Sequence, residues 1–376
     1  MIYLDNSATT KPHPSVLQSF QDASEKFFAN PSSIHQLGGA AERLLTRARE
    51  QIAEILNVQP DEIIFTSGGT EGNNMAIKGV AFNYQQRGKH IITTEIEHPS
   101  VYETCKGLEK LGFEITYLPV NKKGVISLDD LVKAIRDDTI LISVMHVNNE
   151  LGSIQPIEEI GKIAANYPKL FFHVDDVQGL GKVPLSLTDS GVDLCTFSGH
   201  KIHGLNGTGA MYVKKNTSLF PLLHGGGQEL SLRSGTENLA GAVSFAKALR
   251  LHDEERREKY NELLKMRSYL FDSLTNIDGV IMNSTLEGAP HIINISVPHL
   301  KPEVVIHQLS EYGIYISTKS ACSSKQNDIS RILAACGHDR DISATALRIS
   351  LSYQNTMAEV EKFVETFKLV INQLSQ

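Results

Sequence analysis

The sequence predicts an α/β fold in which a largely parallel sheet is covered by helices on both faces. Three stretches are mostly apolar, at 90–94, 139–145 and 170–174. Two segments with helical spacing of apolar residues separate them, at 128–135 and 157–165. Strands that are apolar throughout and alternate with helices are typical of parallel sheets buried on both faces. We therefore expect the polar residues that follow these strands to meet at one edge of the sheet, where such folds bind ligands.

Further elements extend this pattern along the chain. A long helical pattern includes Leu44, Ala48 and Ile52, and it is followed by a predicted strand at 62–66. An apolar run from Val192 to Phe197 predicts another buried strand. These elements complete a large domain built around one sheet.

A change of composition predicts the boundary between two domains. The helical stretch at 239–266 is apolar at first and strongly charged at 252–259, and 376 residues are enough for one large and one small core. We expect a large domain at 13–250 and a smaller α/β domain formed by 1–12 and 251–376. The small domain is predicted to contain strands at 292–297, 314–317 and 347–351, and a C-terminal helix whose capping box is Thr356 and Glu359.

Charge and composition exclude several classes of function. The formal net charge of −7 provides no basic stripe, so no direct binding of nucleic acid is expected. No stretch is long and apolar enough to span a bilayer, and the N-terminus lacks the features of a signal peptide, which predicts a cytoplasmic protein without membrane contact. The four cysteines are widely spaced, so neither a disulfide framework nor a metal site is expected.

A glycine-rich turn at 67–74 joins the strand at 62–66 to a helix that is predicted to begin near Met75. Glycines such as Gly69 let the backbone approach an anion, and a helix N-terminus offers free N–H groups. The turn is therefore a candidate phosphate cup, with Thr70 as one ligand. A plain strand-to-helix turn capped by Thr70 explains the same residues.

Three polar residues at strand ends point to one cofactor. Lys201 follows a buried strand in a glycine-bounded turn, Asp175 ends a second strand, and His98 follows a third. Taken alone, each has an ordinary interpretation as a solvated lysine, a turn cap or a loop residue. Together with the phosphate cup they form the parts that hold pyridoxal 5′-phosphate. These are a lysine for the aldehyde, a carboxylate for the pyridine nitrogen and a ring that stacks on the cofactor.

Cys322 lies in a small, polar segment at 317–325, which indicates an accessible thiol. Lys319 and Lys325 favour the thiolate, which is the reactive form of cysteine. We predict that Lys319 helps to hold Cys322 as thiolate, and that an unchanged thiol pKa in Lys319→Gly contradicts this. The other thiols are expected to be structural: Cys105, Cys195 and Cys336.

These motifs together resemble the class I, NifS-like cysteine desulfurases of the class V aminotransferase family. The resemblance covers nearly the whole chain, through motifs at 3–10, 30–33, 66–71, 97–98, 148–150, 198–201, 233–238, 320–323 and 347–350. It implies the fold-type I fold of pyridoxal-phosphate-dependent transferases, with a mostly parallel seven-stranded sheet, and a homodimer. It also implies removal of sulfur from L-cysteine, which gives L-alanine and a persulfide on Cys322. A sulfur-acceptor protein, such as an iron–sulfur scaffold or a tRNA-thiolation enzyme, would then take the sulfur.

The resemblance also implies a role for each site residue. Lys201 binds the cofactor covalently and later moves the substrate's α-proton, while His98 stacks on the ring and assists proton transfer. Asp175 pairs with the pyridine nitrogen and Gln178 bonds the ring hydroxyl. The phosphate ligands are Gly69, Thr70, Ser198 and His200, joined by Thr236 of the other subunit. The substrate ligands are Asn149, Arg348 and Asn30.

The sequence departs from the family pattern in three places. Lys319 replaces a common glycine, Leu205 and Asn206 replace a common Pro-Lys, and Asp176 stands where a small residue is usual. None of these changes removes a catalytic group. Two alternatives remain, a related lyase that acts on selenocysteine without a persulfide and an inactive homologue that serves as a binding scaffold. The first would keep activity in Cys322→Ala, and the retention of Lys201 argues against the second.

Overall fold

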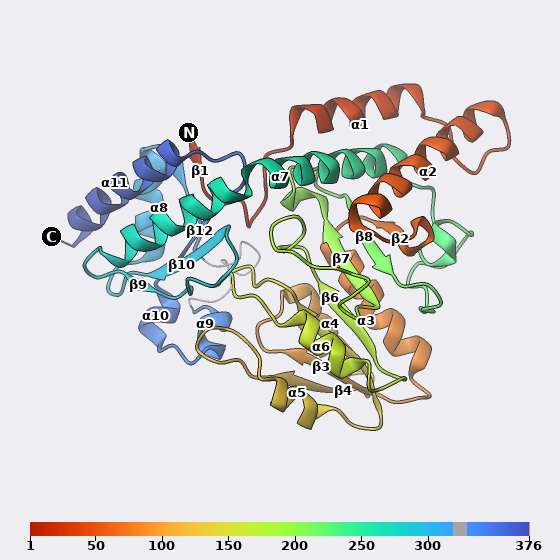
Figure 1. The fold of residues 1–376 in the computed structure, drawn as a ribbon, viewed down its shortest axis with the longest axis horizontal. Helices are drawn as coiled ribbons and strands as arrows, with labels where there is room; N and C mark the ends of the chain where they lie inside the picture. The colour runs from red at the N-terminus through yellow and green to blue at the C-terminus, as the bar shows by residue number, and fades with distance from the viewer. Residues whose placement is uncertain (319–328, 376) are drawn as a thin grey trace.

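The computed structural model describes residues 1–318 and 329–375. Its centre is a seven-stranded sheet that is parallel except for one strand (Figure 1). The antiparallel strand is β8 (Gly209–Val213), which pairs with β2 on one side and β7 on the other. The strand order is β2 (Ile63–Thr66), β8, β7 (Leu194–Ser198), β6 (Phe171–Asp175), β5 (Thr139–Met145), β3 (His90–Thr94) and β4 (Glu114–Leu118).

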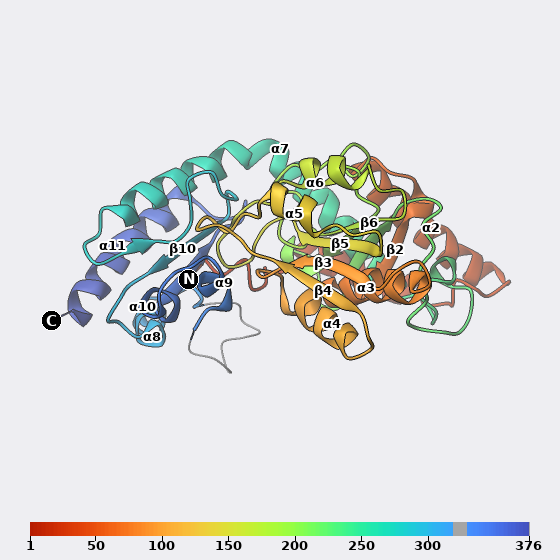
Figure 2. The same cartoon turned by 90° about the horizontal axis from the view of Figure 1, so that it is seen from below.

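Neighbouring residues of each strand enter two different cores, because side chains alternate between the faces of a sheet. In β3, Ile91 packs on one face and Ile92 on the other, and Leu141 and Ile142 do the same in β5. Helices α3 (Gly69–Tyr84) and α4 (Pro99–Glu109) cover the Ile91 face. Helices α5 (Leu128–Ala134) and α6 (Ile157–Ala164) lie on the opposite side of the sheet (Figure 2).

Helix α7 (Leu239–Thr275) runs along the molecule and takes part in two cores (Figure 1). Its first part packs on the large sheet through Phe245 and Leu249, and its last part packs in a separate core through Leu263 and Leu270. Helices α1 (Pro14–Lys26) and α2 (Gln36–Leu56) both pack against α7. Because one helix serves both cores, it connects the two parts of the fold.

The second core belongs to the smaller part of the molecule. Its three-stranded antiparallel sheet has the order β12 (Ala346–Ser350), β10 (Ile292–Ser296) and β9 (Ile281–Met282). A parallel pair of short strands, β1 (Ile2–Tyr3) and β11 (Ile314–Tyr315), brings the N-terminus to this part of the fold. The helices are α8 (Pro302–Glu311), α9 (Arg331–Ala335), α10 (Arg340–Ala344) and α11 (Met357–Leu374).

The structure confirms the predicted α/β class and most of the predicted elements. The bounds of β3 and β5 are those expected, β6 begins one residue later, and α7 continues past 266 to Thr275. The capping box of α11 forms as predicted. The helix expected near Met75 begins earlier, at Gly69. The domain boundary at 250/251 stays a prediction, although the two cores fall on either side of it.

In the described part of the chain, no helix is both long and apolar enough to cross a bilayer.

Candidate active site

A cavity at the carboxyl ends of the parallel strands collects most of the predicted site residues. It encloses about 750 Å³, including open solvent at its mouth. The ends of β6 and β7, the start of α3 and strand β12 of the second core all contribute to its lining. The predicted residues that line it are Gly69, Thr70, His98, Asn149, Asp175, Gln178, Ser198, His200, Lys201 and Arg348.

Lys201 ends a short 3₁₀ turn (Gly199–Lys201) that directly follows β7. Its ammonium donates hydrogen bonds to the backbone carbonyls of Ser7 and Ala8, both at 2.6 Å. Its own carbonyl accepts a hydrogen bond from the ammonium of Lys182 at 2.9 Å. The N-terminal segment and the turn therefore hold both ends of this lysine inside the cavity.

Asp175 is a buried carboxylate that faces the same cavity from the end of β6. One oxygen accepts a hydrogen bond from the Asn73 side-chain amide at 2.7 Å, and the other accepts the backbone N–H of Val177 at 3.1 Å. Burial raises the pKa of Asp175 to about 6, while both hydrogen bonds act in the opposite direction. The group is therefore mostly ionised at neutral pH and can accept a hydrogen bond from a protonated ring nitrogen.

The glycine turn before α3 forms a narrow, polar end of the cavity. Gly68 has a φ of 142°, a conformation that residues with a Cβ rarely adopt. A methyl group added at Gly69 would lie 2.8 Å from Cγ2 of Val177, so the turn leaves room for the backbone alone. The first N–H groups of α3 have no partner within the helix, and Thr70 and Ser198 line the same space. This geometry favours an anion at the helix N-terminus.

His200 also lines this polar end, from the 3₁₀ turn that carries Lys201. Its Nδ1 lies 3.2 Å from the hydroxyl of Thr9. Burial and, to a smaller extent, the nearby charge of Lys201 lower the pKa of His200 to about 4. The ring is therefore neutral at pH 7 and contributes one N–H donor instead of a charge.

His98 caps the N-terminus of α4 and faces the cavity. Its Nδ1 accepts the backbone N–H of Ser100 at 3.1 Å and lies 2.7 Å from the Ser100 hydroxyl. Burial lowers the pKa of His98 to about 4, with a further contribution from the charge of Lys201. Because Nδ1 accepts a hydrogen bond, the neutral ring carries its proton on Nε2.

Gln178 ties the N-terminal segment to the cavity wall. Its side-chain oxygen accepts a hydrogen bond from the Ser7 hydroxyl at 3.1 Å, and its amide donates to the Ser7 carbonyl at 3.0 Å. Ser7 in turn donates its backbone N–H to the hydroxyl of Ser350. These contacts hold the Ser7 carbonyl where it accepts a hydrogen bond from Lys201.

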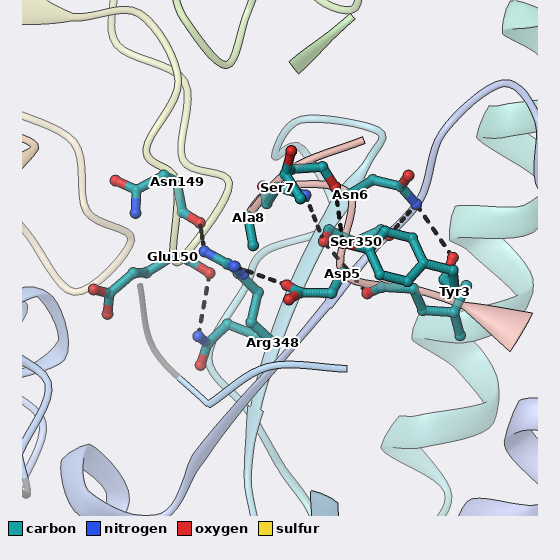
Figure 3. A network of polar contacts seen from close by, with 12 residues as sticks. Tyr3, Asp5, Asn6, Ser7, Ala8, Asn149, Glu150, Arg348 and Ser350 are labelled. Carbon is teal, nitrogen blue, oxygen red and sulfur yellow. Dashed lines mark hydrogen bonds and ion pairs between the residues drawn. The ribbon is translucent and has the colours of Figure 1, made fainter. Parts of the chain in front are cut away.

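Arg348 is a buried cation that comes from β12 (Figure 3). Its guanidinium donates to the carbonyl of Asn149 at 2.8 Å and forms an ion pair with Asp5 at 2.9 Å. Its Nε is buried without a hydrogen-bond partner. The guanidinium lines the cavity, so a carboxylate that enters can form a charge-assisted hydrogen bond with it.

Two predicted site residues lie outside this cavity. Asn30 is exposed, and its side-chain oxygen accepts the backbone N–H of Ser32 at 2.8 Å. Thr236 is exposed on the loop before α7. Arg233, three residues before Thr236, forms an ion pair with Glu71 at 2.9 Å. The roles assigned to Asn30 and Thr236 stay predictions.

Cys322 and Lys319 lie outside the described residues, so their predicted roles stay predictions. Cys105, Cys195 and Cys336 are buried, as expected for structural thiols. Burial raises the pKa of Cys105 and of Cys336 to about 12. Residues 1–318 and 329–375 contain no cluster of side chains able to hold a metal ion.

Three contributors to the site were not predicted from the sequence. Asn73 holds the Asp175 carboxylate and also donates a hydrogen bond to Ser100, and the carbonyls of Ser7 and Ala8 hold Lys201. Asn73 could have been found, because it lies three residues after Thr70 and so shares its helix face. The backbone carbonyls leave no signal in the sequence.

The chain is similar to known proteins over its whole length. The family model for aminotransferase class-V matches residues 2–363. The chain belongs to this family. It is 45% identical over 379 residues to a NifS/IcsS protein homolog of Lactobacillus delbrueckii subsp. bulgaricus, covering 100% of this chain and 98% of the relative.

A protein of Dictyoglomus turgidum named cysteine desulfurase IscS is 42% identical over 375 residues, which are 99% of this chain and 95% of that protein. A solved structure described as a NifS-like protein superimposes with a TM-score of 0.93 at 40% identity, over 99% of both chains. This chain therefore has the same fold as that NifS-like protein. The alignments leave no large part of this chain unmatched.

Proposed function

We propose that this protein is a cysteine desulfurase that uses pyridoxal 5′-phosphate to remove sulfur from L-cysteine. The products would be L-alanine and a persulfide on Cys322, which passes its sulfur to an acceptor protein. The observation that carries the proposal is the single cavity that brings Lys201, Asp175, His98 and Arg348 together. A relative that is 42% identical over nearly the full chain and is named cysteine desulfurase supports the choice of substrate.

The shape and donors of the cavity fit pyridoxal phosphate. The glycine turn at Gly68 and Gly69 leaves backbone room and free N–H groups for a phosphate, and Ser198 and His200 stand beside it. At a different point of the cavity, the buried carboxylate of Asp175 offers an acceptor for a protonated pyridine nitrogen. When it is bound, this cofactor supplies an aromatic ring that accepts electrons from the substrate's α-carbon.

The other steps, which are substrate binding, proton transfer and sulfur transfer, would be carried out by residues of the chain. Lys201 must give up a proton to act as a base, and its position between the Ser7 and Ala8 carbonyls fixes its nitrogen until that point. His98 offers a neutral ring to stack on the cofactor, because burial keeps its pKa near 4. Arg348 binds and orients the substrate carboxylate through charge-assisted hydrogen bonds. Cys322 would attack the sulfur atom and retain it as a persulfide.

We also propose that the active form is a homodimer. Several large apolar side chains of the α1–α2 region are exposed, including Phe28 at 75% and Ile34 at 106%. Where such exposed apolar side chains form one contiguous patch, they mark an interaction surface. Thr236 lies on an exposed loop of this chain, which agrees with a role in the cavity of a second subunit.

The acceptor would be a sulfur-carrier partner such as an iron–sulfur scaffold or a tRNA-thiolation enzyme, and the protein would act in the cytoplasm.

The test uses the purified, cofactor-loaded protein with L-cysteine and a thiol reductant. We expect equal amounts of alanine and sulfide from the wild type. Cys322→Ala should lose sulfide production, whereas the matched change of a buried thiol, Cys105→Ala, should retain it. Full activity in Cys322→Ala would instead favour a lyase that needs no persulfide. A protein that binds no pyridoxal phosphate would overturn the proposal.

A further inference from the structure

Buried charged residues lie next to the turn at Gly199–Lys201. Asp176 follows the predicted cofactor ligand Asp175 but lies 2.7 Å from Nδ1 of His146 through one carboxylate oxygen. Lys182 is also buried, and its ammonium donates a hydrogen bond to the Lys201 carbonyl at 2.9 Å. Asp176, where the sequence departs from the family pattern, is six residues before Lys182, which contacts the turn that carries the proposed cofactor lysine.

The backbone between Asp176 and Lys182 is folded tightly. The Leu180 N–H donates to the Asp176 carbonyl at 3.0 Å, and the Lys182 N–H donates to Gly179 at 2.8 Å. A methyl group added at Gly179 would lie 2.1 Å from the Asp176 carboxylate and 2.4 Å from His146, so a glycine is needed where this pair forms. The fold therefore fixes how Asp176 and Lys182 are placed relative to each other.

The charges around Lys182 are unbalanced without Asp176. Burial lowers the pKa of Lys182 to about 8, and Asp176 is the group that raises it. The ammonium also lowers the pKa of the surrounding histidines, which are neutral or positively charged and therefore cannot offset a buried cation. These histidines are His200, His203, His252 and His291. Other titratable groups close to Asp176 are His146, Asp175 and Cys195.

We propose that Lys182 and Asp176 act as positioning residues for Lys201. The Lys182 ammonium fixes the Lys201 turn through its carbonyl, and the Asp176 carboxylate supplies the buried negative charge that offsets this ammonium. Buried charges are costly unless they are compensated, so the two residues should depend on each other. This inference rests on the proposed role of Lys201 as the cofactor lysine.

The first test measures the visible absorbance of the enzyme loaded with pyridoxal phosphate as a function of pH. Lys182→Met removes a buried cation close to Lys201, so the pH midpoint of the absorbance change should rise by about 1 unit. Lys182→Arg keeps the charge and the donors and should restore the wild-type midpoint. An unchanged midpoint in Lys182→Met would overturn the inference, since a purely structural role would not move or restore it.

The second test needs no cofactor and compares urea unfolding of four forms. These are the wild type, Asp176→Ala, Lys182→Met and the double variant. Each single change leaves a buried charge without its counterpart, so the double variant should lose less stability than the sum of the two single losses. Additive losses would contradict the coupling. Asp176→Asn, which keeps the shape of the side chain, serves if Asp176→Ala does not fold.

The two tests separate this inference from the proposed function. A wild-type protein without a visible band would contradict the role of Lys201, whereas the unfolding cycle would still report whether Asp176 and Lys182 are coupled.

Discussion

Replacement of Asp175 by asparagine should abolish activity while leaving the fold intact. The change keeps the size of the side chain and removes its negative charge. Activity should fall by about 100-fold or more, because an amide cannot keep a pyridine nitrogen protonated and thereby stabilise charge in the transition state. The free energy of unfolding of the cofactor-free protein should change little, because the substitution has two effects of opposite sign.

Two opposing effects act on the stability of Asp175→Asn. Burial raises the pKa of Asp175 from 3.8 to about 6, so the ionised group costs the folded state about 3 kcal/mol at neutral pH. The variant removes this cost. It also places an N–H₂ group against a donor, the Asn73 amide or the Val177 N–H, and leaving that buried donor unsatisfied costs about 2 kcal/mol. The two effects cancel to within about 1 kcal/mol.

The pH dependence of this difference has a defined sign. A group whose folded-state pKa is raised favours the folded state at low pH and loses this contribution as pH rises through its folded-state value. For Asp175 that value is about 6. Relative to Asp175→Asn, the wild type should therefore lose about 1 kcal/mol between pH 5 and pH 7.5.

The assays are alanine production from L-cysteine and urea unfolding of the cofactor-free protein at both pH values. Asp129→Asn, an exposed carboxylate on α5, is the control and should change neither quantity. Activity of Asp175→Asn within tenfold of the wild type, or an unfolded variant, would refute the reasoning.

Three further results are expected. Arg348→Lys should raise KM for cysteine about tenfold or more with a smaller change in kcat, because a lysine ammonium cannot keep the guanidinium's contacts with Asn149 and Asp5 while it binds the substrate carboxylate. A fall in kcat with an unchanged KM would argue against this role. Gly209→Ala should destabilise the protein by about 2 kcal/mol or more in urea unfolding, since the added methyl group would lie 2.6 Å from backbone atoms; a stability equal to the wild type would contradict the packing. Iodoacetamide at pH 8 should leave Cys105, Cys195 and Cys336 unmodified in the folded protein, because burial raises the pKa of each thiol, and mass spectrometry of the peptides would reveal the opposite.

The sheet was predictable where hydrophobicity alone determines a strand. Strands β3 and β5 are buried on both faces of the sheet, so the bounds predicted from their sequences agree with those in the structure. Strand β8 was not predicted, because its sequence begins with Gly209 and Ala210 and its antiparallel direction depends on pairing with β2 and β7. Pairing over long sequence distances is a property of the tertiary structure.

The site was predictable to the extent that function uses polar or charged side chains at strand ends. Lys201, Asp175 and His98 were identified from their positions, and the structure places all three on one cavity. The carbonyls of Ser7 and Ala8 were not, because any residue type provides a carbonyl and only the fold brings these two to Lys201. For the same reason, the sequence marked Asp176 as unusual without indicating its contact with His146.

The most direct measurement is mass spectrometry of the loaded wild-type protein after a single turnover with L-cysteine, combined with quantification of alanine. We predict one added sulfur atom on the peptide that contains Cys322 and one alanine released for each sulfur retained. Alanine released without sulfur on that peptide, or no alanine at all, would contradict the proposed cysteine desulfurase activity.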